Sequence, residues 1–329
     1  MQTRVLCGRP VSAISLGCMN LSHAYGAPPA REQGMALIER ALELGVTHFD
    51  TATLYGFGRN EELVGAALAR RRRDVLLASK CGMAGVDGKR VIDGRPETLR
   101  RECHESLRRL ATDHIDLYYL HRVDPKVAVE ESVGALGALV RDGLIGRVGL
   151  SEVSAATLRR AHAVHPIAAV QSEYSVWTRN PAFGVLAACR DVGATFVAFS
   201  PLARGFFTDR GVDVAQFVGG DIRRGMPRFQ EPHLQRNERL REPFARLAQG
   251  EGLTSAQLAL AWLLAQDSAL IALPGTTNAA HLEEDLAASG ATVSAATLAA
   301  VDALVNPTTV SGPRYNAQTQ AEIDTEETP

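Results

Sequence analysis

The feature that most constrains the fold of this chain is an alternation of short apolar runs with longer stretches of helical period, repeated eight times. The expected strands lie at residues 13–17, 46–50, 75–79, 115–120, 146–150, 168–172, 195–200 and 269–273. Several of these runs are apolar without alternation, as in strands that are covered on both faces. The helical stretches follow near 32–44, 60–70, 97–110, 129–142, 155–164, 182–192, 232–266 in two pieces, and 279–288. This repetition predicts an α/β fold, a (β/α)8 TIM barrel, with a doubly wound open sheet as the alternative.

Three segments fall outside the eightfold pattern. Residues 5–11 predict an N-terminal β-hairpin that covers one end of the barrel, and residues 203–231 form a long loop rich in glycine and arginine. Residues 294–305 predict an extra C-terminal helix with Ser294 as its N-cap. We expect the polar tail after about residue 307 to be partly mobile. Because no linker-like break separates the units, we expect residues 1–329 to form one domain.

Charge and cysteine content exclude several kinds of partner. The chain balances 35 basic against 37 acidic side chains, a net charge of −2, which offers no electrostatic footprint for nucleic acid or an anionic membrane. No run of about 18 apolar residues is present, so no membrane span is expected. The five cysteines are scattered, without the spacing of a disulfide framework or a zinc site, which favours a reducing cytoplasm. The sequence leaves open whether the protein is a monomer or a homo-oligomer.

Four residues capable of acid–base chemistry stand where the expected strands end, which is where barrel active sites are built. Asp50, Lys80 and His121 follow three strands, and Tyr55 lies one short loop after Asp50. Reducing a carbonyl needs a proton at oxygen, and a phenol of pKa about 10 is a sluggish acid near neutrality. An ammonium about 4 Å away would favour the phenolate by ~4 kcal/mol at an effective dielectric of about 20. We expect Tyr55 to be the general acid, Lys80 to lower its pKa, Asp50 to hold Lys80, and His121 to hydrogen-bond the carbonyl oxygen or Tyr55.

The rarity of lysine supports this assignment. Only Lys80, Lys89 and Lys126 account for lysine among the 35 basic residues. A planar guanidinium is too bulky for a point contact with a phenol oxygen, so Lys80 stands at a position where arginine would fail.

The same residues belong to motifs that resemble those of the aldo-keto reductase family. The motifs occur in the family's order between residues 4 and 315, and they are Phe49-Asp50-Thr51-Ala52 with Tyr55-Gly56, Ser79-Lys80, Leu120-His121-Arg122, Val148-Gly149-Leu150-Ser151, Val170-Gln171, and Phe199-Ser200-Pro201-Leu202. Within the family the chain is most similar to the soluble bacterial, fungal and plant branch that includes pyridoxal-reductase-like and auxin-induced-like proteins. The resemblance implies NAD(P)H-dependent reduction of aldehydes or ketones to alcohols.

The resemblance also implies an extended nicotinamide nucleotide across the barrel mouth. No Gly-x-Gly-x-x-Gly fingerprint of a Rossmann site follows an early strand. Ser151 and Gln171 would bind the carboxamide, Phe199 would stack on the nicotinamide ring, and Gly275 begins the adenosine end. The full set of expected cofactor residues is Met19, Asp50, Ser151, Glu152, Gln171, Phe199, Ser200, Pro201, Leu202, Arg204, Gly205, Arg228, Gly275, Thr276, Thr277, His281, Glu284 and Asp285.

The expected cofactor is NADPH, with NADH left open. Positions that usually carry basic residues in the family are Asn278 and His281, and Asp285 replaces the usual asparagine. A 2′-phosphate would lose a charge-assisted contact there.

The substrate is expected to be a small aldehyde, ketone, quinone or dicarbonyl. The residues expected to surround it mix aromatic and small polar groups: Asn20, His23, Tyr25, Leu54, Phe57, Val123, Trp177 and Tyr315. Two other functions stay open. One is a nucleotide-binding regulatory subunit with little turnover. The other is a metal-dependent barrel hydrolase. It is less favoured, because no His-x-His pair occurs and only His121 clearly ends a strand. No metal site is expected.

Overall fold

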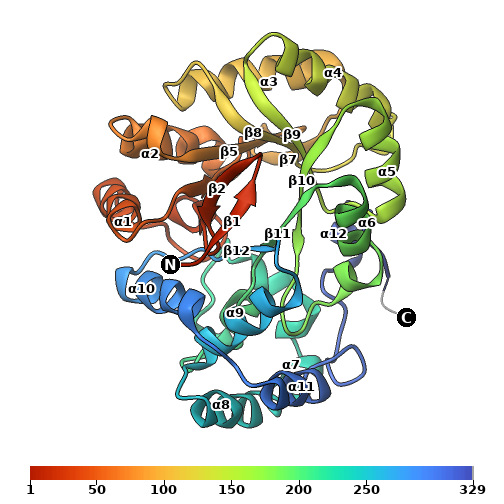
Figure 1. The fold of residues 1–329 in the computed structure, drawn as a ribbon. Helices are drawn as coiled ribbons and strands as arrows, with labels where there is room; N and C mark the ends of the chain where they lie inside the picture. The colour runs from red at the N-terminus through yellow and green to blue at the C-terminus, as the bar shows by residue number, and fades with distance from the viewer. Residues whose placement is uncertain (328–329) are drawn as a thin grey trace.

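The computed structural model describes residues 1–327, and its centre is a ring of eight parallel strands (Figure 1). The ring closes where Ile14 pairs with Ala272, and the Ser15 amide donates to the Ala272 carbonyl at 2.9 Å. The predicted (β/α)8 barrel is therefore confirmed, and the open sheet is wrong. In ring order the strands are β3 (Leu16–Gly17), β4 (His48–Asp50), β5 (Leu76–Cys81), β8 (Ile115–Leu120), β9 (Ile145–Ser151), β10 (Ile167–Glu173), β11 (Thr195–Phe199) and β12 (Ile271–Leu273).

Helices cover the outside of the ring. One follows each strand of the barrel: α1 (Arg31–Glu43), α2 (Arg59–Leu68), α3 (Pro96–Arg109), α4 (Val129–Arg141), α5 (Ala155–Val164), α6 (Val185–Val192), α9 (Ser255–Gln266) and α10 (Ala279–Ala287). The stretch expected as two helices forms three, because α7 (His233–Glu238) and α8 (Arg241–Gly250) precede α9. Pro243 is tolerated in the first turn of α8, whereas it would break a continuous helix. The extra helix α11 (Ala295–Leu304) begins at Ser294, which accepts from the Thr297 amide as predicted.

The barrel interior is apolar at one end and polar at the other. The hairpin of β1 (Thr3–Leu6) and β2 (Arg9–Ser12) places Leu6 and Val11 in a buried cluster with the inward side chains of five strands, namely Leu76, Ala78, Leu117, Tyr119, Ala169, Val197, Ile271 and Leu273. Because strand side chains alternate, the same inward series continues to Lys80 in β5 and Gln171 in β10. The hairpin thus closes the apolar end, and the polar side chains gather at the opposite one.

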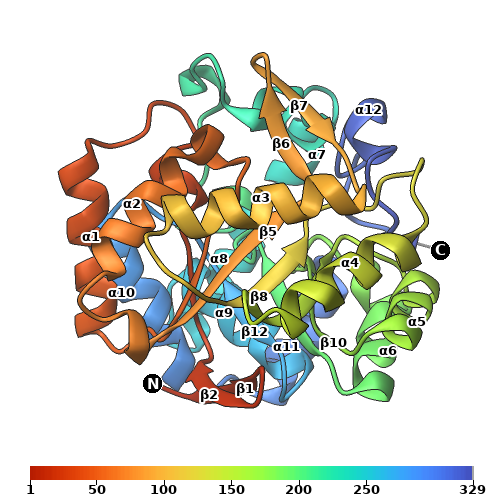
Figure 2. The same cartoon turned by 90° about the horizontal axis from the view of Figure 1, so that it is seen from above.

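Two further segments border the polar end. A hairpin of β6 (Met83–Val86) and β7 (Lys89–Ile92) rises beside the short helix α12 (Ala317–Gln320) in Figure 2. Its turn is Asp87-Gly88, both at positive φ, a known hairpin signal that the sequence analysis overlooked. The tail after residue 307 buries Arg314 and Tyr315, and its partial mobility stays a prediction.

Among residues 1–327, no helix combines the length and apolar character needed to cross a membrane.

Candidate active site

The centre of the site is an ion pair and a phenol, all buried. Lys80 extends inward from β5, and its Nζ donates to the carboxylate of Asp50, to the Thr51 carbonyl at 2.9 Å and to Tyr55 Oη at 3.2 Å. Gln171 Nε2 donates to the second oxygen of Asp50 at 2.8 Å. Side chains from β4, β5 and β10 and from the loop after β4 thus form one hydrogen-bonded group, in which Lys80 links Asp50 to Tyr55.

Burial changes the pKa values of these residues from those that the neighbouring charges alone would predict. Burial raises the pKa of the Tyr55 phenol, and the nearby Lys80 ammonium offsets only part of that increase. Lys80 lowers the pKa of Tyr55 as expected, but desolvation is the larger effect, so the net pKa lies above its ordinary value. Burial lowers the pKa of Lys80, but Asp50 and Tyr55 outweigh this effect and raise it overall. The resting site therefore pairs a charged lysine with a protonated tyrosine.

The imidazole of His121 faces Tyr55 from the end of β8. The two ring centroids lie 5.8 Å apart at 85°, an edge-to-face arrangement. Burial, followed by the charges of Arg122 and Lys80, holds the pKa of His121 well below its usual range. Its buried Nδ1 has no hydrogen-bond partner within residues 1–327. The ring also lines the cavity, so a neutral imidazole borders the space beside Tyr55.

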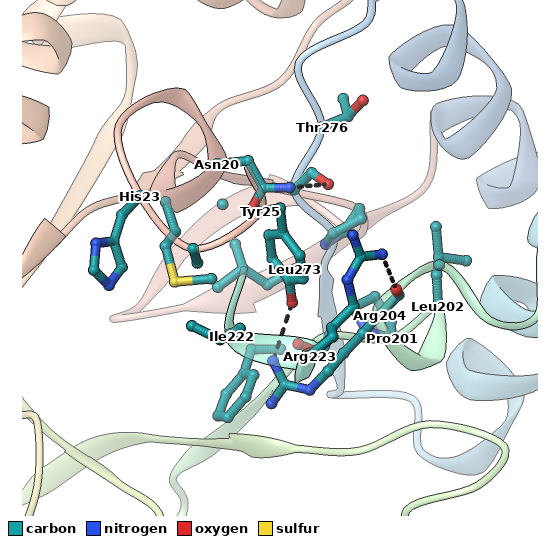
Figure 3. Close-up of a pocket in the computed structure, with 18 of the residues that line it drawn as sticks. Asn20, His23, Tyr25, Pro201, Leu202, Arg204, Ile222, Arg223, Leu273 and Thr276 are labelled. Atoms are coloured by element: carbon teal, nitrogen blue, oxygen red, sulfur yellow. Dashed lines mark hydrogen bonds between the residues drawn. The ribbon is translucent and has the colours of Figure 1, made fainter. Parts of the chain in front are cut away.

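Asp50, Tyr55, His121 and Gln171 line one cavity of about 810 Å³, part of which Figure 3 shows. Such a volume is within the range of about 300–1,000 Å³ for small-molecule and cofactor sites. All but two of the expected cofactor residues line it: Met19, Asp50, Ser151, Gln171, Phe199, Ser200, Pro201, Leu202, Arg204, Gly205, Gly275, Thr276, Thr277, His281, Glu284 and Asp285. The cavity joins the catalytic group to the start of α10, as an extended nucleotide requires.

Glu152 and Arg228 do not line the cavity, so the structure contradicts their expected cofactor contacts. The Glu152 carboxylate pairs with buried Arg314 and accepts from the Glu173 amide at 2.8 Å. Glu152 follows Ser151 at the end of β9, so it points away from the cavity while Ser151 faces it. Arg228 donates to the Trp177 carbonyl at 2.8 Å. Glu152 and Arg228 instead hold the C-terminal tail and the long loop in place, outside the cavity wall.

The expected substrate residues divide in the same way. Asn20, His23, Tyr25, Leu54 and Tyr315 line the cavity. Phe57, Val123 and Trp177 do not. Phe57 is exposed, because its backbone adopts positive φ (55°), and Trp177 packs in an aromatic cluster, with its ring centroid 4.8 Å from that of Phe206.

The buried Arg204 side chain connects other residues through an ion pair and hydrogen bonds, so it is not a free cation. It pairs with Glu173 at 2.6 Å and donates to the hydroxyls of Tyr25 and Tyr315, each at 3.0 Å. Arg223 donates to the backbone carbonyl of Arg204 at 3.2 Å, and these side chains lie together in Figure 3. Arg204 therefore joins the loop before α1 to the C-terminal tail across the cavity.

At the adenosine end, the first amides of α10 are already engaged. The Asn278 side chain accepts from the Ala280 amide at 2.8 Å and from the His281 amide at 3.4 Å. Burial, followed by the charge of Glu284, raises the pKa of Asp285 well above its usual range. Two of the first amides are therefore occupied, residues 275–285 contain no arginine, and Asp285 is held toward its neutral form.

Sequence reasoning missed two arginines of the cavity wall, Arg90 on β7 and Arg210 on the long loop. No motif marks either residue, because each reaches the cavity from a segment outside the barrel.

The chain is similar to known proteins along nearly its whole length. The sequence profile of the aldo/keto reductase family matches residues 13–306. The probable aldo-keto reductase 1 of Glycine max is 42% identical over 312 residues, which cover 94% of this chain and 89% of that protein.

Solved structures give the same similarity. The glycerol dehydrogenase of Gluconobacter oxydans superposes with a TM-score of 0.84 at 29% identity, covering 92% of this chain and 94% of that one. An aldo-keto reductase from Klebsiella pneumoniae, solved in complex with NADPH, gives a TM-score of 0.74 at 26% identity, covering 96% and 99% of the two chains.

Proposed function

This chain belongs to the aldo/keto reductase family, and we propose that it reduces aldehyde or ketone carbonyls to alcohols with NADPH as the hydride donor. The observation that carries this proposal is the Tyr55–Lys80–Asp50 chain at the wall of a cavity whose other end lies at α10. Bound NADPH would supply the hydride to the carbonyl carbon. The protein must then supply the proton to the oxygen.

Tyr55 donates that proton. Its phenol stays protonated in the resting site, and Lys80 at 3.2 Å stabilises the phenolate that remains after transfer. Asp50 keeps Lys80 charged and aimed at Tyr55. The neutral His121 ring, edge-on to Tyr55 in the cavity wall, lies where it can orient the carbonyl group of the substrate.

The chemistry is tested by following the absorbance of reduced nicotinamide with a broad panel of small carbonyl compounds. We expect NADPH consumption and alcohol formation with several of them. Tight NADPH binding without any turnover would contradict the proposal and favour a nucleotide-binding regulatory subunit.

Arg210 supports NADPH as the cofactor. It lines the cavity, and its exposed side chain makes no ion pair or hydrogen bond with residues 1–327. Its neighbour Asp209 accepts from the Ser255 amide at 3.0 Å, while Gln257 in the same turn of α9 donates to the Glu284 carbonyl at 3.4 Å. These contacts place Arg210 near the adenosine end, where a guanidinium can meet a 2′-phosphate.

Replacing Arg210 with glutamine should therefore raise the dissociation constant for NADPH by about 10- to 100-fold, the loss expected for a charged hydrogen bond. The dissociation constant for NADH, which lacks the 2′-phosphate, should change less than about twofold, as measured by fluorescence titration. Arg224→Gln is a matched control, because Arg224 lies on the same loop but outside the cavity wall. Equal weakening of both nucleotides would refute this role.

The pKa directions predict the pH dependence of the reaction. Because burial raises the pKa of Tyr55, the phenol stays protonated. The value of kcat/KM for reduction should therefore be constant from about pH 6 to pH 9. We expect no change of kcat/KM near pH 6.5, because His121 is already neutral there. Alcohol oxidation needs the phenolate and should instead rise with pH. A fall of the reduction rate through pH 8 would show that Tyr55 has a lowered pKa.

We also propose the reducing cytoplasm as the compartment, because all five cysteines are free thiols.

A further inference from the structure

The β6–β7 hairpin brings a guanidinium to the catalytic end of the cavity. Arg90 lines the cavity and pairs across the hairpin with Gly85, so the two residues share one face. The Phe57 ring covers that face closely: a Cβ added to Gly85 would lie 1.9 Å from Phe57 Cδ1. Phe57 is two residues from Tyr55, which places Arg90 beside the catalytic loop rather than at the adenosine end.

Electrostatics agree with this location. The positive charge of Arg90 contributes, after burial, to lowering the pKa of His23, and it adds a smaller contribution at His121. Both imidazoles line the same end of the cavity. Arg122 also lies in the wall, donating to the Ser151 hydroxyl at 3.1 Å. Within residues 1–327, the cavity wall here carries one carboxylate, Asp50, and Lys80 already neutralises it.

The guanidinium of Arg90 has N–H donors that are available to a ligand. Its only carboxylate partner among the described residues is Glu322 in the tail after α12, which accepts from Nη2. A guanidinium has five N–H donors, so several remain for a ligand. The side chains are 38% and 21% exposed, so solvent screens this ion pair and it contributes little to stability. An incoming anion can therefore replace Glu322.

We propose that Arg90 is a specificity-determining residue that binds an anionic group, carboxylate or phosphate, on the carbonyl substrate. The inference rests on the proposed reductase function and names its substrate class. The carbonyl lies at Tyr55 and His121, and the anion reaches Arg90 in the place that Glu322 now occupies. Neutral carbonyl compounds of the same shape are reduced less efficiently.

The test compares 4-carboxybenzaldehyde with its neutral methyl ester, because the two share one ring and one aldehyde. Arg90→Gln should lower kcat/KM for the carboxylate at least about tenfold and leave the ester within about twofold. Glu322→Gln should raise kcat/KM for the carboxylate several-fold by removing the competing anion. Glyceraldehyde 3-phosphate against glyceraldehyde forms the second arm and distinguishes a phosphate from a carboxylate as the preferred group.

Lys89→Gln is the matched control. It removes one positive charge from the adjacent residue of β7, which faces the opposite side of the hairpin and does not line the cavity. Equal effects of the Lys89 and Arg90 variants, or an equal loss for acid and ester, would overturn the inference. Failure of the wild type to reduce even the ester would instead refute the proposed function.

Discussion

Replacing Tyr55 with phenylalanine should lower kcat for carbonyl reduction by ~10²–10⁴-fold, the range for a lost general acid. The variant removes one oxygen and keeps the ring, so the edge-to-face contact with His121 at 5.8 Å survives. Lys80 loses one of its three acceptors but keeps Asp50 and the Thr51 carbonyl. The dissociation constant for NADPH should therefore stay within about threefold of wild type.

Single-turnover kinetics with NADPH provide the measurement, and thermal unfolding confirms that the variant is folded. Tyr174→Phe is a suitable control, because Tyr174 is a buried tyrosine outside the cavity wall that packs against Phe196 and Trp262. A Tyr55 variant that reduces carbonyls within threefold of wild type would exclude this residue as the acid.

Replacing Asp50 with asparagine should lower the free energy of unfolding by about 3–5 kcal/mol, because it leaves the Lys80 ammonium buried without its counter-ion. Lys80 is fully buried, and Asp50 is its only carboxylate partner among the described residues. The loss is a large part of the stability of a typical chain. Urea unfolding followed by circular dichroism measures it.

A second variant separates charge from packing. In Asp50→Asn combined with Lys80→Met, the uncompensated ammonium is gone, so the double variant should be more stable than Asp50→Asn alone. Both variants should be nearly inactive. If the double variant were the less stable of the two, the pair would be held by packing and not by charge compensation.

Strand periodicity explains why the barrel and the positions of the proposed catalytic residues could be predicted. Asp50 and Lys80 end strands, and a barrel brings all strand ends to one mouth whatever their separation in sequence. Phe199 and Gly275 were predicted through the family resemblance and also lie in the cavity wall.

The contributions of loops and tail could not be predicted in this way. Arg90 and Arg210 reach the cavity through a hairpin and a long loop whose docking depends on contacts between distant segments. The polar composition of the tail suggested mobility, but buried ion pairs such as Arg314–Glu152 satisfy its charges. The net pKa of Tyr55 could not be predicted because a sequence gives the neighbouring charges and not the extent of desolvation.

The β6–β7 hairpin has a consequence for how enzymes of this architecture diverge. Its two strands pair only with each other and join the barrel through the end of β5 and the start of α3. Mutation or exchange of the β6–β7 hairpin therefore leaves the hydrogen bonds between the strands of the central ring unchanged. Selection can alter which molecules are admitted while the proton-transfer residues, fixed on the ring, are inherited unchanged. In this chain, the proposed anion-binding residue and the proposed proton-transfer residues therefore lie on separately evolvable parts of the polypeptide.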